Sequence, residues 1–192
     1  MKSRVCSSPL LVALPLATAL LVVGCERPEV PLPVISTPAA TAAPTSVAEP
    51  MVAAQLVPAP VSVPYAAWST CNMEHVDGQA FSSQPSVVKA GHDFTIDGYA
   101  FIESRQSVPK DIKLRVLSAA SALAWEADIK GRVNRPDIPQ YFKLGEWAAG
   151  AGIEQLFSSA ALPPGTYHLL FTASDGDGKL ICDNGRQIAI SP

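Results

Sequence analysis

The residues that could support catalysis are few in this chain of 192 residues, and they are scattered along it. His75, His92 and His168 are well separated, and no two of them have the spacing that places metal ligands on one face of a helix. A serine hydrolase would need a GxSxG motif with a base and an orienting acid, and the sequence contains no such motif. We therefore predict no catalytic residues and no metal site, although residues distant in sequence can still meet in space.

The carboxylates also lack a recognisable catalytic or metal-binding arrangement. The segment Asp175-Gly176-Asp177-Gly178 is similar to the start of a calcium loop, but an EF-hand needs glycine at position six and glutamate at position twelve. This chain has Leu180 and Arg186 there, so the segment predicts a tight turn between strands. Glu103, Asp111 and the other carboxylates show no pairing that would suggest a glycosidase.

One neighbourhood combines aromatic and charged residues, namely Arg135, Tyr141, Phe142 and Trp147. Such side chains stack on a sugar or a protein partner, and core packing is the alternative explanation. Arg135, Tyr141 and Trp147 are therefore our candidate ligand-binding residues. Residues 65–192 carry 11 basic and 14 acidic residues, so the electrostatic footprint of a nucleic-acid-binding protein is missing.

Residues 1–24 have the pattern of a secretory signal peptide. Lys2 and Arg4 precede an uncharged apolar run over residues 10–23. This apolar run is about 14 residues long, whereas about 20 are needed to cross a bilayer. Pro9 and Pro15 also interrupt the uncharged stretch, which favours a signal peptide over a transmembrane helix.

The end of this segment, Leu21-Val22-Val23-Gly24-Cys25, resembles the lipobox of bacterial lipoproteins. The resemblance implies that Cys25 becomes the first mature residue and carries a diacylglycerol and an N-acyl chain. Two or three chains give a stable anchor, since one chain binds only marginally. By the sorting rule of these lipoproteins, Glu26 implies the outer membrane, with the domain facing the periplasm or the cell surface. An ordinary signal peptide with a chance cysteine at this position is the alternative.

Export from the cytoplasm would also determine whether the remaining cysteines form a disulfide. Cys6 lies in the segment that would be removed, which leaves Cys71 and Cys182 in the globular part. Exported proteins meet oxidising conditions, so we expect one disulfide between them, closing a loop of about 110 residues. A metal pair or a reactive thiol is the alternative, but no CxxC motif or neighbouring histidine supports either.

Residues 25–64 read as the lipidated N-terminus and a tether. Residues 26–64 include 9 prolines and 8 alanines. Because proline fixes φ and removes a backbone donor, we expect no helix or sheet ladder here, but a disordered, partly polyproline II linker that holds the domain away from the membrane. A proline-rich recognition motif is the alternative, although no basic residue follows Arg27 in this segment.

Residues 65–192 contain all 13 aromatic residues and predict one β-rich domain. Apolar and polar residues alternate over 94–99, 112–116 and 123–129, and the last two runs predict a hairpin. We expect Asp137 to cap a short helical turn that ends before Gly145. Turn motifs at 162–165, 175–178 and 183–185 separate further short strands. This spacing predicts an immunoglobulin-like antiparallel β-sandwich, with a small barrel as the alternative.

The order of short motifs over residues 68–192 resembles an immunoglobulin-like module of bacterial extracytoplasmic and membrane-attached proteins, often found beside envelope polysaccharide machinery. The resemblance implies an immunoglobulin-like fold and an envelope setting, with no catalytic residues to transfer. The chain departs from it at Tyr99, where tryptophan is commoner, and at Gly152-Ile153, where Gly-Phe is expected. The matching residues are Cys71, Val76-Asp77-Gly78, Gly98-Tyr99-Ala100, Arg135-Pro136-Asp137, Leu162-Pro163-Pro164-Gly165-Thr166-Tyr167 and Cys182.

Together these features predict a non-enzymatic, lipid-anchored envelope protein without a cofactor other than its covalent lipid. Its sandwich would bind another envelope component, with a protein partner as the leading expectation. A carbohydrate-binding module for envelope glycans is the alternative and predicts exposed aromatic side chains. An enzyme is the third hypothesis and predicts histidine and carboxylate side chains that converge in a cleft.

Overall fold

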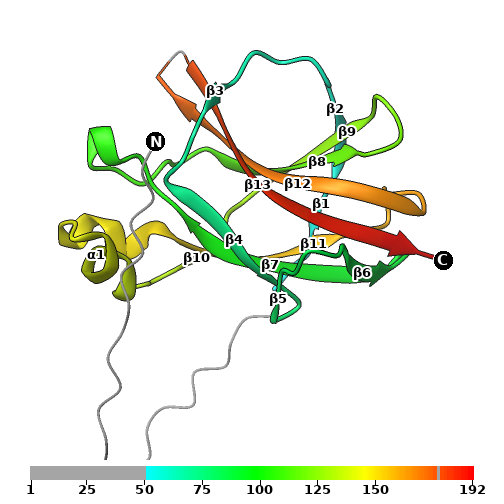
Figure 1. Cartoon of the computed structure of the whole chain (residues 1–192), viewed down its shortest axis with the longest axis horizontal. Coiled ribbons are helices and arrows are strands. Elements are labelled where there is room, and N and C mark those ends of the chain that lie inside the picture. Colours follow the sequence, from blue (N-terminus) through cyan, green and yellow to red (C-terminus); the bar gives the residue numbers. More distant parts are fainter. Residues whose placement is uncertain (1–50, 177) are drawn as a thin grey trace, which may run out of the picture. The chain divides into compact units, whose positions relative to one another are not determined.

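The computed structural model describes residues 51–176 and 178–192. These residues form two β-sheets packed on one another, which confirms the predicted all-β sandwich (Figure 1). The signal peptide, Cys25 and the tether as far as residue 50 lie outside the described residues.

The first sheet has six strands in the order β1-β11-β7-β4-β5, with β10 also paired to β11. Its pairs are antiparallel except that of β1 with β11, which is parallel. Its strands are β1 (Ala54–Gln55), β4 (Cys71–Val76), β5 (Gln79–Ala80), β7 (Asp93–Ala100), β10 (Arg132–Val133) and β11 (Gly152–Ser158).

The second sheet has seven strands in the order β2-β9-β8-β12-β13-β3, with β6 also paired to β13. Both β3 and β6 run parallel to β13, so the sheets are mixed at the short strands β1, β3 and β6, and the other strand pairs are antiparallel as expected. Its strands are β2 (Val57–Ala59), β3 (Ala66–Ala67), β6 (Ser86–Lys89), β8 (Ile112–Ser118), β9 (Ala124–Asp128), β12 (Gly165–Asp175) and β13 (Gly178–Ser191).

The core lies between the sheets and follows the alternation read from the sequence. In β7, Phe94 and Ile96 are fully buried, whereas Thr95 and Asp97 are half-buried. The hairpin expected over residues 112–129 is confirmed as the antiparallel pair β8–β9. Side chains from both sheets fill the interior, among them Phe94, Ile96, Ile153, Phe157, Leu114, Val116, Leu169, Phe171 and Ile188.

The folded part begins before residue 65. The strands β1 and β2 pair with β11 and β9, and Leu56 between them is buried in the core. The expectation of a tether without sheet structure is therefore wrong for residues 54–59. Pro58 is tolerated because β2 is an edge strand, where a missing N–H interrupts no central ladder.

The predicted turn at residues 183–185 is also wrong, because β13 continues through it as one bulged strand. Leu169 lies opposite Arg186 but Phe171 lies opposite Cys182, so two steps along β12 match four along β13. Gly185 takes a φ of 67°, a left-handed conformation that glycine adopts without strain. The sequence Asp183-Asn184-Gly185 therefore serves a bulge and not a chain reversal.

This bulge joins the two sheets. Asn184 donates from Nδ2 to the carbonyl oxygen of Cys71 at 3.3 Å, and Arg186 donates from Nε to that of Met73 at 3.1 Å. The predicted disulfide between Cys71 and Cys182 is confirmed at the same place. Side-chain bonds and a covalent link thus hold β4 against β13.

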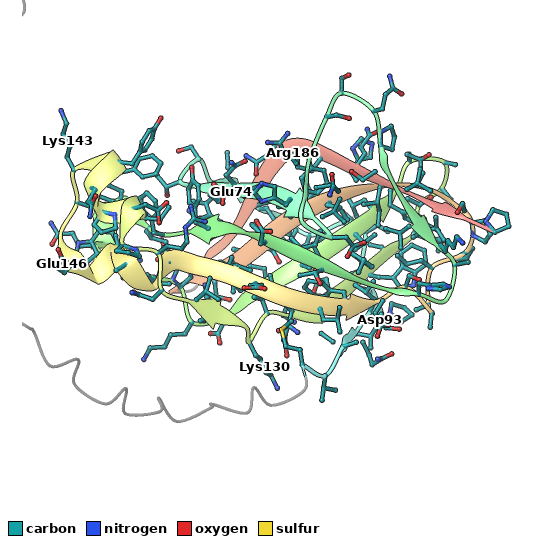
Figure 2. The ribbon with its side chains drawn as sticks, turned by 90° about the horizontal axis from the view of Figure 1, so that it is seen from below. Glu74, Asp93, Lys130, Lys143, Glu146 and Arg186 are labelled. Atoms are coloured by element: carbon teal, nitrogen blue, oxygen red, sulfur yellow. A yellow bond between two sulfur atoms is a disulfide. The ribbon has the colours of Figure 1, made fainter. Side chains whose placement is uncertain are left out.

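The helical segments are η1 (Glu103–Arg105), α1 (Asp137–Phe142) and η2 (Glu146–Ala151). The α1 region, marked by Lys143 and Glu146, lies at the end of the sandwich opposite Asp93 (Figures 1 and 2). The expected capping by Asp137 is wrong, because Pro136 holds the cap position and the Asp137 carboxylate binds Arg135. The helix ends at Phe142, before Gly145 as expected, and its C-cap Lys143 adopts a left-handed conformation. No helix within the described residues is both long and apolar enough to span a bilayer.

Candidate functional site

A depression with a volume of about 320 Å³ lies where β4 and β7 meet the segment around α1. It brings together Arg135 and Tyr141, two of the three ligand-binding candidates chosen from the sequence. We call it the Arg135 pocket. Its lining consists of polar, charged and aromatic side chains and one isoleucine, namely Asn72, Glu74, Tyr99, Arg135, Asp137, Ile138, Tyr141 and Phe142.

Strand register positions the two halves of the Arg135 pocket. Asn72 on β4 and Tyr99 on β7 are directly opposite in the antiparallel ladder, and Gly152 on β11 lies on the other side of Tyr99. A Cβ atom added at Gly152 would lie 2.5 Å from both Cγ of Arg135 and the carbonyl oxygen of Val133. The close approach of the Arg135 segment to the sheet therefore requires glycine at residue 152.

A small aromatic cluster, separate from the main core, shares Tyr99, Ile138 and Phe142 with the pocket lining. Phe101 is fully buried and makes edge contacts with Phe142 and Trp147, with ring centres 5.2 and 6.0 Å apart. Tyr99 meets the edge of Phe142 at 5.6 Å. Trp147 packs into this cluster and does not line the pocket, so the structure separates it from Arg135 and Tyr141.

Arg135 is held by two carboxylates. Its Nε and Nη2 donate to the two carboxylate oxygens of Asp137 at 2.9 and 2.7 Å, and its Nη1 donates to Oε2 of Glu74 at 2.7 Å. The bonds to Asp137, followed by the bond to Glu74, raise the pKa of Arg135. In turn, the bonds that Arg135 donates to Asp137 lower the pKa of the Asp137 carboxyl group. The guanidinium is thus fixed in position and its charge is already compensated.

The pocket also presents groups that are free to bind. Tyr141 is 80% exposed and stands edge-on to Phe142, with ring centres 4.9 Å apart. Asn72 accepts a bond from Arg186 through Oδ1, but within the described residues its Nδ2 and the hydroxyls of Tyr99 and Tyr141 have no hydrogen-bond partner. Burial, and then the nearby Glu74 and Tyr141, raise the pKa of Tyr99.

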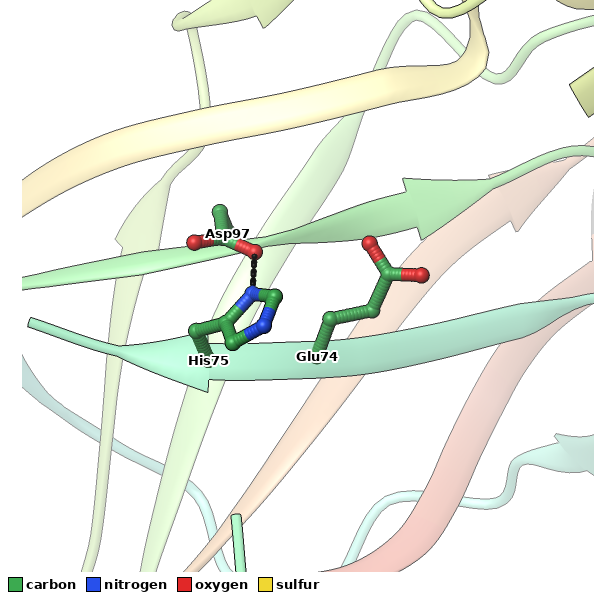
Figure 3. A group of neighbouring side chains, drawn as sticks. All are labelled: Glu74, His75 and Asp97. Carbon is green, nitrogen blue, oxygen red and sulfur yellow. Dashed lines mark hydrogen bonds and ion pairs between the residues drawn. The ribbon is translucent and has the colours of Figure 1, made fainter. Parts of the chain in front are cut away.

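Beside the pocket, Glu74, His75 and Asp97 form a group whose nitrogen and oxygen atoms lie within 4.8 Å of one another (Figure 3). Glu74 and His75 are neighbours on β4, where a regular strand would turn them to opposite faces, but the pairing of β4 with β7 shifts register between Met73 and His75. Sequence reasoning missed this convergence because no residue pattern marks the irregularity.

The chemistry of this group is set by its protein contacts. Nδ1 of His75 lies 2.7 Å from Oδ1 of Asp97, while Oε2 of Glu74 accepts from Arg135. An imidazole and two carboxylates are ligand types that divalent cations accept, but here they pair with protein groups, and we assign no ion to them. His168 lies on β12 in the other sheet, beside Gln187, and His92 precedes β7.

Comparisons of the chain with protein-family models, curated proteins and solved structures gave no match.

Proposed function

We propose that this protein is a lipid-anchored component of the bacterial cell envelope whose sandwich binds another envelope component through the Arg135 pocket. The observation that carries the proposal is the 80% exposure of Tyr141 beside the fixed Arg135 side chain. Tyrosine combines a large apolar ring with a polar tip, and it is enriched at recognition surfaces for that reason. A positioned polar network next to an exposed ring needs little reorganisation to bind.

The anchor and the tether give this binding its setting. Acyl chains on Cys25 would hold the protein at the membrane. A proline-rich linker before β1 would let the sandwich sample a limited volume, which raises the effective concentration of its pocket toward envelope ligands.

The pocket electrostatics support binding and not proton transfer. A general acid or base works best when its pKa lies near the working pH. The pKa of Asp137 is lowered by Arg135, and the pKa of Tyr99 is raised by burial. At neutral pH, Asp137 therefore stays a carboxylate and Tyr99 stays a neutral phenol, which suits fixed hydrogen-bonding roles. We accordingly propose that these two groups bind the ligand and do not transfer protons.

Site-specific photocrosslinking in intact cells tests this proposal. A benzophenone amino acid replaces Tyr141 in the full-length chain, and a matched control carries it at Val87, which is 70% exposed on β6. We expect light-dependent adducts with envelope material at residue 141 and not at residue 87. The absence of adducts at residue 141, or identical adducts at both positions, would contradict the proposal.

A further inference from the structure

The charge balance of the Arg135 pocket restricts the ligand. Glu74 and Asp137 contribute two carboxylates against the single guanidinium of Arg135, whose Nε, Nη1 and Nη2 all donate to them. Asp97 adds a further carboxylate next to Glu74. A phosphate, sulfate or uronate group would have to displace these partners and face uncompensated negative charge. The pocket is therefore unsuited to an anionic ligand.

The free polar groups match a ligand that both donates and accepts hydrogen bonds. Oε1 of Glu74 takes no bond from Arg135, which leaves a charged acceptor at the pocket. Nδ2 of Asn72 is a donor, and the hydroxyls of Tyr99 and Tyr141 can act in either direction. Sugar hydroxyls have this dual character, and their bonds to a carboxylate are charge-assisted.

The pocket presents one exposed aromatic ring, that of Tyr141, beside the half-buried rings of Tyr99 and Phe142 and the buried Ile138. Among the described residues, the exposed large hydrophobic side chains are Met51, Val52, Val57, Val61, Val87, Leu123 and Tyr141, and only Tyr141 lines the pocket. A stable protein interface buries roughly 1,600 Å² in total with an apolar centre, whereas this surface offers one exposed ring. A volume of about 320 Å³ is at the lower end of the range of about 300–1,000 Å³ for small-molecule sites.

We infer that the Arg135 pocket binds an uncharged pyranose ring of an envelope glycan, which stacks on Tyr141 and hydrogen-bonds to Glu74 and Asn72. This inference rests on the proposed binding function and names its ligand class. Arg135 acts as a positioning residue that holds Glu74 and Asp137 in place.

Binding of defined oligosaccharides to the full-length protein in detergent micelles tests the inference. The neutral probe is a hexamer of β-1,4-linked N-acetylglucosamine, the anionic probe is a hexamer of galacturonic acid, and calorimetry measures both affinities. We expect the neutral hexamer to bind and the anionic hexamer to bind at least tenfold more weakly. Tyr141→Ala should weaken binding of the neutral hexamer at least tenfold. Leu123→Ala, at a side chain that is 52% exposed and outside the pocket, should leave it unchanged.

The outcomes separate this inference from the proposed function. Failure to bind the neutral hexamer, equal or tighter binding of the anionic hexamer, or an unchanged affinity in Tyr141→Ala would overturn the sugar assignment. If the sugar fails while a crosslinker at residue 141 captures a protein, the binding function stands with a protein ligand. If neither sugar nor crosslinked partner is found, both proposals fail.

Discussion

Arg115 and Glu126 are opposite each other on β8 and β9 and form an ion pair in which the Arg115 side chain is only 1% exposed. The same guanidinium donates through Nη2 to the carbonyl oxygens of Pro60 and Val61, at 2.5 and 3.0 Å. It also lies 5.5 Å from the ring centre of Tyr65. Arg115 therefore binds the chain segment that precedes β3 to the second sheet. Such a buried charge is stable only while its partners remain in place.

Replacing Arg115 with methionine should strongly destabilise the domain. Two backbone carbonyls would lose their donor, and Glu126 would keep only the Tyr65 hydroxyl at 3.3 Å and the Lys113 ammonium at 3.8 Å. Breaking one side of a buried pair costs about 3–5 kcal/mol of unfolding free energy. Urea unfolding measures the loss. The matched control is Arg105→Met, because Arg105 pairs with Asp175 while 56% exposed, and such pairs contribute below about 1 kcal/mol. Equal effects of the two substitutions would contradict the role given to Arg115.

Removal of the disulfide should also destabilise the domain. The bond joins residues 111 positions apart, and the chain-entropy model gives about 4.7 kcal/mol for a loop of this size, with measured losses of about 2–5 kcal/mol. We expect Cys71→Ala/Cys182→Ala to lower the urea midpoint. Reductant should lower the midpoint of the wild-type protein and leave that of the double variant unchanged; sensitivity of the double variant would show that another bond is involved.

Some of this architecture follows from local sequence signals. The β8–β9 hairpin is predictable because two alternating runs are close together in the chain. The pairing of β1 and β2 is not, since their partners β11 and β9 come roughly 70–100 residues later, and prolines in the segment argue against a ladder. The sequence Asp183-Asn184-Gly185 is compatible with a turn and with a bulge. Only the strand register of β13 with β12 shows that it forms a bulge.

Some residues of the Arg135 pocket are likewise predictable from the sequence, and others are not. Arg135 and Tyr141 are recognisable because they are near each other in sequence. Asn72, Glu74 and Tyr99 reach the pocket through the register of β4 with β7, including a local irregularity that no residue pattern encodes. Aromatic composition alone cannot distinguish Tyr141, which is exposed, from Trp147, which packs on Phe101.

The stability of the domain should decrease at high pH in part through Tyr167. This tyrosine donates its hydroxyl to the carbonyl oxygen of Pro163 at 2.6 Å, and burial raises its pKa above the usual value of 10.0. Because the folded state holds the proton more tightly, its contribution is fully present below the unfolded pKa and is lost as the pH rises through the folded pKa.

The variant Tyr167→Phe tests this pH dependence. Loss of the hydrogen bond should cost about 0.5–1.5 kcal/mol at neutral pH, and the decrease in unfolding free energy above pH 10 should become shallower. Urea unfolding at a series of pH values measures both. A decrease as steep as in the wild-type protein would exclude Tyr167 as a contributor.

Lipidation is testable at Cys25, which we propose as the acylated residue because the residues before it resemble a lipobox. Cys25→Ser should abolish incorporation of labelled fatty acid and move the protein out of the detergent phase in phase partitioning, as a soluble or unprocessed form. Cys6→Ser, in the segment expected to be removed, is the control and should behave like the wild-type protein. A mature, lipid-bound species in the Cys25 variant would disprove the anchor.

Gly98 controls the spacing of the strands that carry half of the pocket. It lies on β7 between Met73 of β4 and Ile153 of β11, and an added Cβ would be 2.1 Å from the carbonyl oxygen of Asn72. Since that atom belongs to the backbone, β4 must move for alanine to fit, at a cost of about 1–3 kcal/mol. Movement of β4 displaces Asn72 from Tyr99, so Gly98→Ala should also weaken ligand capture at Tyr141.

Gly150→Ala is the matched control, because an added Cβ there meets nothing within 4 Å. Its effect on unfolding free energy should stay within about 0.5 kcal/mol. Measuring both the unfolding free energy and the ligand capture at residue 141 separates a loss of overall stability from a local change in the pocket. Arg115→Met should lower stability through the segment before β3 and leave capture at Tyr141 intact under folding conditions, whereas Gly98→Ala should reduce both. Equal stability of the two glycine variants would mean that β4 and β7 are not spaced as closely as the position of Asn72 requires.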